Sequence, residues 1–159
     1  MRITGTWQGQ YTYGDGYATI TGISVPFRLS LHESWWFGRV RGHVRDDVSK
    51  GGQPELGMVD GWRKRAAVRF VKVMPAPYVL VDGKLRPLRE LLLQQGITVV
   101  GEMPHWIGYS GAVRDDGRMM EGDWQILERP VQTDRGYMQL GSGSGTWSAH
   151  HVDVRRTSL

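Results

Sequence analysis

The chain has 159 residues, a length that suits one domain with a single sizeable core. It contains no cysteine, which excludes a disulfide framework, a thiolate nucleophile, iron–sulfur clusters and cysteine-bound zinc. The formal net charge is +4, and the 16 Arg and 4 Lys residues allow anionic partners without requiring them.

The first predicted element covers residues 3–13, where rings and glycines at odd-numbered positions alternate with Thr and Gln. A period of two is typical of a strand that buries one face. The same alternation predicts strands at 25–32 and 38–45. In these two strands, Val, Leu, Phe and Gly face inward, while Arg and His lie mostly on the outer face.

The fourth predicted strand, 55–62, has two possible inner faces: the larger residues at even-numbered positions, or the Gly and Val residues between them. The fifth strand, 66–70, sets Ala, Val and Phe against arginines. A sixth at 105–113 has no clear facing. Clear alternation returns in the seventh, 120–126, and in the eighth, 145–154.

The segment 73–104 is too long to be structureless inside a compact domain. It contains Pro87 in a plausible first helical turn, Gly96 as a stop, and Leu85, Leu88 and Leu92 at helical spacing. We therefore expect a short amphipathic helix, either as a lid over one end of the fold or as a plug that completes the core.

The lengths of the connections between the predicted strands differ between the two ends of the fold. In a meander of these strands, the long connections 14–24, 47–54, 73–104 and 127–144 share one end, and the tight ones share the other. A sandwich and a barrel both fit the alternation, but repeated Gly-x-Trp units favour the strong coiling of a small closed barrel. We predict an all-β fold: an eight-stranded antiparallel up-and-down β-barrel with a short helical insertion between strands 5 and 6.

The motifs Gly5-Thr6-Trp7, Gly122-Asp123-Trp124 and Gly145-Thr146-Trp147 resemble strands of calycins, the avidin-like and lipocalin-like barrels. The resemblance extends over most of the chain outside 73–104. Within the calycins, the chain looks like bacterial proteins of unknown function. It implies a single calycin-like domain over 1–159, with 73–104 as a lid-like insertion. It also implies that Gly5 and Trp7 close the floor. Biotin binding is not implied, because the biotin-binding positions of avidin have no match here.

Ten residues are predicted to bind a ligand at the loop-rich end. They are mostly rings on apolar faces, which either line a cavity or fill the barrel. The set is Tyr11, Tyr13, Phe27, Phe70, His105, Trp106, Tyr109, Trp124, Trp147 and His151.

Few titratable groups fall on inner faces. Glu33 and Lys72 are expected to be solvated at the two rims. His151 and His105 could act as acid or base near neutral pH, and His151 could also bind a haem iron or simply be hydrogen-bonded in the wall. No metal site is expected, because His150 and His151 point to opposite faces of one strand. No cofactor is expected.

The expected function is a binding or carrier barrel for a small apolar or aromatic molecule. The alternatives are an enzyme that uses the same cavity with His151 or His105 as acid or base, and a weak nucleic-acid or anion binder through the Arg-rich exterior, where Asp46 dilutes the positive field. No apolar run approaches the ~18 residues of a membrane span. We expect a cytoplasmic protein without a membrane partner. Nucleic acid is disfavoured, because few rings are expected outside the barrel, and homo-oligomerisation is left open.

Overall fold

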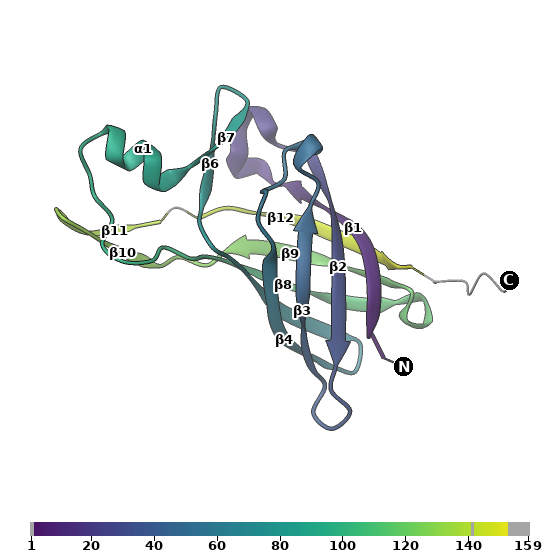
Figure 1. Ribbon diagram of the computed structural model, residues 1–159. Helices are drawn as coiled ribbons and strands as arrows, with labels where there is room; N and C mark the ends of the chain where they lie inside the picture. Colours follow the sequence, from purple (N-terminus) through teal and green to yellow (C-terminus); the bar gives the residue numbers. More distant parts are fainter. Residues whose placement is uncertain (1, 141, 153–159) are drawn as a thin grey trace, which may run out of the picture.

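The computed structural model describes residues 2–140 and 142–152 and contains a closed eight-stranded barrel (Figure 1). Each barrel strand pairs antiparallel with the next, and the last pairs with the first, so the predicted up-and-down barrel is confirmed. The strands are β1 (Gly5–Tyr13), β2 (Ser24–Glu33), β3 (Arg39–Asp46), β4 (Gly57–Lys64), β5 (Ala67–Met74), β8 (His105–Arg114), β9 (Met119–Ile126) and β12 (Ser144–His151).

All the long connections lie at one end, the mouth, as the meander requires (Figure 1). They contain η1 (Asp15–Ile20), η2 (Val48–Lys50), β6 (Tyr78–Val81), β7 (Lys84–Pro87), α1 (Leu88–Gln94), β10 (Pro130–Thr133) and β11 (Gly136–Gln139). The connections at the other end, the closed end, are short: the loop 34–38, the turn at 65–66 and η3 (Asp115–Gly117).

The segment 73–104 differs in detail from the prediction. The helix is shorter than expected, because Leu85 belongs to strand β7 and α1 begins only after Pro87. Asp82 and Gly83 both have positive φ, which suits a two-residue hairpin turn, and β6 pairs with β7 across it. Residues that the leucine spacing assigned to the helix, such as Leu85, are therefore part of a β-hairpin.

Two mouth connections pack together into a second small core. An isolated bridge joins Val99 to Thr133, and the Gly96 carbonyl accepts a hydrogen bond from Arg135. Apolar side chains from both connections fill the space between them, namely Leu92, Val99, Met103, Val131 and Leu140. The cover of the mouth is therefore built from two segments, whereas the sequence indicated only 73–104.

The structure resolves the facing of β4. Gly57, Val59 and Gly61 are buried, while Met58 and Trp62 are each 58% exposed. A Cβ at Gly61 would lie 2.1 Å from the Arg69 carbonyl oxygen, so the close approach of β4 to β5 requires glycine there. The larger side chains of this strand consequently lie on the outer wall.

The closed end is filled by Trp7, which is completely buried and donates its indole N–H to the Ile3 carbonyl at 2.9 Å. Glu33 is buried beside it, against the expectation of a solvated rim carboxylate. One Glu33 oxygen accepts from the Ile3 amide at 2.9 Å, and the other from Arg63 at 2.8 Å. His151 meets Trp7 edge to face, with ring centroids 5.0 Å apart. These contacts shut the barrel at this end.

Candidate functional site

A cavity of about 420 Å³ lies under the mouth. Its inner wall comes from the barrel strands β1, β3, β5, β8 and β9, and its outer wall from η1, the β6–β7 hairpin and α1. We call this space the mouth cavity. It combines a polar cluster of Tyr11, Asp46, Lys72 and His105 with an aromatic wall of Tyr13, Tyr17, Tyr109 and Trp124.

The polar cluster is centred on an ion pair inside the barrel. Lys72 Nζ lies 2.8 Å from each carboxylate oxygen of Asp46, and the two side chains are only 3% and 1% exposed. Tyr11 donates a longer hydrogen bond of 3.5 Å to the same carboxylate. Both sequence expectations are corrected here, since Lys72 is not solvated and Asp46 does not lie on the exterior.

Burial lowers the pKa of the Lys72 ammonium, and its attraction to Asp46 acts in the opposite direction. Burial also raises the pKa of the Tyr11 and Tyr109 hydroxyls, with the Asp46 carboxylate adding to both effects. Both phenols therefore stay protonated at neutral pH and keep an O–H donor.

His105 is the second cationisable group on the mouth cavity. Burial, helped by the nearby Lys72 charge, lowers its pKa to about 4. The imidazole is therefore neutral at neutral pH, with one ring nitrogen available as a hydrogen-bond donor and the other as an acceptor.

The aromatic wall is a set of rings in mutual contact. Tyr13 lies with its ring centroid 4.7 Å from that of Tyr17 and 5.9 Å from that of Trp124. The Trp124 indole donates to the Thr12 carbonyl at 3.1 Å, which orients the ring. Burial raises the pKa of Tyr17 to about 12. This wall offers flat apolar surface with hydroxyl groups at its edge.

The mouth segments cover the cavity with mostly apolar side chains from η1, β6, β7 and α1. They are Ile20, Val79, Leu80, Leu85 and Leu88. Tyr78 is anchored there by a hydrogen bond from its hydroxyl to Glu55. Burial and, to a smaller extent, this hydrogen bond raise the pKa of Tyr78 to about 12. The buried Gln53 Oε1, also at the cavity, has no hydrogen-bond partner in the described part of the chain.

The structure divides the ten predicted binding residues into four groups. Five line the mouth cavity, and these are Tyr11, Tyr13, His105, Tyr109 and Trp124. Phe27, Phe70 and Trp147 belong to the main core; Phe70 stacks on Tyr109 at 4.9 Å. Cavity and filled core, which the sequence left as alternatives, thus occupy different levels of one barrel.

The remaining two predicted binding residues lie away from the cavity. Trp106 is on the outer wall, 37% exposed, with the Arg129 guanidinium carbon 3.7 Å from its ring centroid. His151 is at the closed end, where its ring meets Trp7 and its Nε2 lies 3.4 Å from the Thr4 carbonyl oxygen. Of the two histidines considered as acid or base, only His105 borders the mouth cavity.

Sequence reasoning missed Asp46, Tyr17 and Gln53 as cavity residues. A signal for Asp46 was present, because the inward alternation of Val40 and Val44 reaches position 46 two residues later. Tyr17 and Gln53 are in mouth connections, where no periodicity indicates direction.

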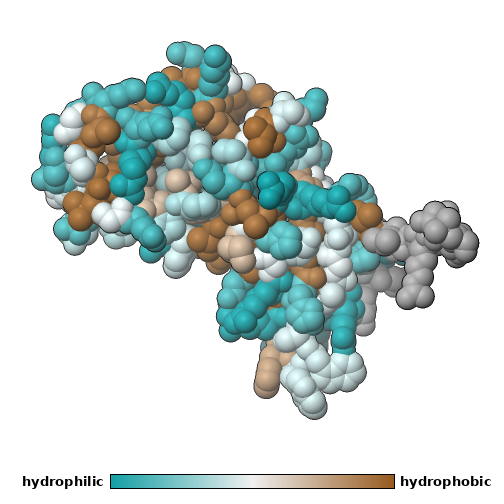
Figure 2. Space-filling model, in the orientation of Figure 1, coloured by the Kyte–Doolittle hydropathy of each residue, from teal (hydrophilic) through white to brown (hydrophobic). Residues whose placement is uncertain are grey.

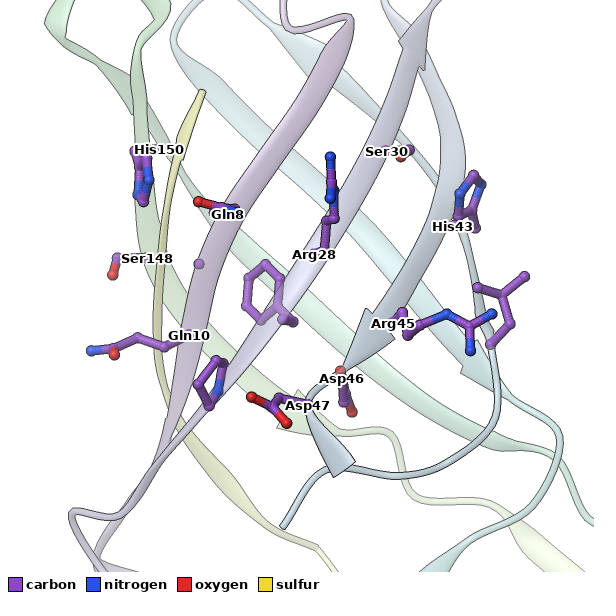
Figure 3. Close-up of a pocket in the computed structure, with 14 residues that line it drawn as sticks. Gln8, Gln10, Arg28, Ser30, His43, Arg45, Asp46, Asp47, Ser148 and His150 are labelled. Atoms are coloured by element: carbon purple, nitrogen blue, oxygen red, sulfur yellow. The ribbon is translucent and has the colours of Figure 1, made fainter. Parts of the chain in front are cut away.

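A second hollow, of about 730 Å³, is a groove on the outer wall over β1, β2, β3 and β12 (Figure 3). It is lined mainly by side chains on the outer faces of these strands, among them Gln8, Arg28, His43, Arg45 and His150. Arg28 and Arg45 are cross-strand neighbours, and both are exposed. The groove contains Arg28 and Arg45, which are part of the Arg-rich exterior expected from the sequence, and salt screens such exposed charges.

Comparison with protein-family models, curated proteins and solved structures found no match to the chain. Within residues 2–140 and 142–152, no helix has the length and apolar character needed to cross a membrane. The same residues contain no cluster of His, Asp or Glu side chains that could hold a metal ion.

Proposed function

We propose that the protein is a calycin-like binding barrel that takes up one small molecule in the mouth cavity. The observation that carries the proposal is the composition of the cavity wall. Tyr13, Tyr17 and Trp124 offer ring surface, and Lys72 with Asp46 and His105 offers polar groups on the same space. Ligand pockets are typically apolar with a few placed polar groups.

The wall favours a ligand with an aromatic or apolar body and one polar end. The body would lie against the rings and beneath Leu80 and Leu88. The polar end would meet the cluster around Lys72, and a donor on it would satisfy the unpartnered Gln53 Oε1. A volume of about 420 Å³ suits a molecule of drug size or smaller.

The test uses N-phenyl-1-naphthylamine, an apolar fluorophore with one N–H donor. We expect saturable binding, seen as enhanced fluorescence. Ile126→Trp, which places a larger side chain at the cavity wall, should weaken binding about tenfold or more. Ile23→Trp is the matched control, because Ile23 is 49% exposed and does not line the cavity.

Equal binding by the parent and the Ile126→Trp variant would contradict the proposal, as would the absence of saturable binding. Native mass spectrometry of protein purified from its own host gives an independent measurement. A retained small molecule that is displaced by the naphthylamine would identify the ligand class.

A further inference from the structure

A cluster of exposed rings lies at the closed end, away from the mouth cavity. The loop between β2 and β3 carries three consecutive rings, and Trp35, Trp36 and Phe37 are 72%, 80% and 88% exposed. In Figure 1 this loop is the lowest point of the ribbon, beyond the other closed-end turns. Trp is nearly neutral on the hydropathy scale and Phe is hydrophobic, and the lowest part of the molecule in Figure 2 is pale and tan.

The backbone holds these rings outward. Ser34 N–H donates to the Arg39 carbonyl at 2.7 Å, which closes the loop, and the Gly38 carbonyl accepts from the Arg63 amide at 2.7 Å. Gly38 has φ of +62°, and a Cβ there would lie 2.3 Å from the Arg63 carbonyl oxygen. The loop is therefore attached to the end of β4, and its three rings remain exposed.

Several cations lie at the same end of the barrel as the loop. The Arg2 guanidinium carbon lies 4.3 Å from the Trp35 ring centroid, and Lys64, Arg65 and Arg118 are exposed on the neighbouring turns. None of these four has a carboxylate partner among the side chains that the structure describes. The other closed-end arginines are paired: Arg39 with Asp60, Arg63 with Glu33 and Arg114 with Glu121. Asp115 and Asp116 are two acidic residues in η3 at this end, and the four cations outnumber them.

We propose that the closed end docks on a membrane surface rich in anionic phospholipid, with the loop 34–38 inserted at the headgroup level. Trp is favoured at that depth because its ring is apolar and its N–H is polar. The cations beside it would meet lipid phosphate and carboxylate groups. The sequence led us to expect no membrane partner because it has no spanning segment, and interfacial insertion of a loop needs none.

Charge favours lipid over the other occupants. A second copy in a two-fold contact would bring the same cations against this end, and like charges repel. Single-stranded nucleic acid is bound in grooves where successive bases stack on rings. The three rings here instead occupy a projecting loop.

Flotation of the full chain with lipid vesicles tests the proposal at low ionic strength. We expect binding to vesicles of equal parts phosphatidylserine and phosphatidylcholine, and much weaker binding to pure phosphatidylcholine. The triple variant W35S/W36S/F37S should lose binding. Tyr137→Ser is its control, because Tyr137 is an exposed ring (76%) on β11 at the mouth.

A charge variant tests the second half of the interaction. K64Q/R65N should weaken binding to the anionic vesicles about tenfold or more; Asn suits position 65, where φ is +56°. K50Q/K84Q removes two exposed lysines at the mouth and should bind like the parent. Thermal unfolding would verify that all variants are folded.

Three results would overturn the proposal. The first is no flotation with either vesicle, and the second is a ring variant that floats like the parent. The third is a parent protein that does not bind vesicles but self-associates or binds an oligonucleotide, and that loses this interaction in the ring variant. Naphthylamine binding should be the same in all these variants, so this proposal and that of the mouth cavity fail separately.

Discussion

Lys72 Nζ lies 2.8 Å from both carboxylate oxygens of Asp46, and the barrel encloses the two side chains. Removing one partner leaves the other charge buried alone, whereas replacing both with apolar groups removes both desolvation costs. We expect Asp46→Ala to lower the free energy of unfolding by about 3–5 kcal/mol.

The double variant Asp46→Leu with Lys72→Met should lose less stability than Asp46→Ala does. Urea denaturation followed by circular dichroism measures both. An Asp46→Ala variant with the stability of the parent would mean that the ion pair does not form inside the barrel.

Gly5 provides a test of how the closed end is packed. Its φ is +142°, and a Cβ there would lie 2.3 Å from His151 Nε2. Gly5→Ala should therefore destabilise the fold by about 1–3 kcal/mol, again measured by urea denaturation. Gly16→Ala is the control, because a Cβ at Gly16 would meet no atom within 4 Å. Similar losses in the two variants would argue against a crowded floor.

His105 predicts a loss of stability in acid. Its pKa is about 4 in the folded chain and near 6.5 when exposed in the unfolded chain. Between these values the unfolded chain binds more protons, so the free energy of unfolding falls as the pH drops from about 6.5 to about 4. At about pH 5 the loss amounts to about 2 kcal/mol relative to neutral pH.

The His105→Gln variant isolates this contribution, because carboxylates also titrate at low pH. We expect its stability to fall less than that of the parent between neutral pH and about pH 5. His43→Gln, which removes an exposed histidine, should follow the parent. A His105→Gln profile that coincides with the parent profile would show that the imidazole is not held neutral by burial.

Two aromatic residues on opposite sides of the wall distinguish the cavity from the outer surface. Tyr17 is half-buried and lines the mouth cavity, whereas Trp106 lies outside against Arg129. Tyr17→Ala should weaken naphthylamine binding by about 1–2 kcal/mol, and Trp106→Ala should leave it unchanged. Fluorescence titration measures both. If Trp106→Ala weakened naphthylamine binding and Tyr17→Ala did not, the ligand would bind on the outer wall.

The barrel was predictable because its signals are local. Alternation in 3–13 shows which face is buried, and the order of long and short connections requires no knowledge of pairing. The β6–β7 hairpin was missed because its four-residue strands are too short for a period to emerge, while Leu85, Leu88 and Leu92 fit a helix by spacing alone.

The site was predictable only in part, because its chemistry depends on contacts distant in sequence. Alternation places Lys72 on the inner face, but its pairing with Asp46 follows from the closure of the wall around both. In β8, Trp106 and Tyr109 are large rings on opposite faces, so composition cannot say which one is inside. The stacking of Arg129 on Trp106 joins the connection between β9 and β10 to strand β8.

The seam between β1 and β12, where Trp7 is paired with His151, has a consequence for biosynthesis. A ribosome makes β1 first among the barrel strands and β12 after the others, so the wall cannot be completed before β12 has been made. Until then β1 and β9 each present an unpaired edge, the kind of surface on which nascent chains aggregate. Slow folding with many distant pairings, and a need for protection during synthesis, are built into this topology.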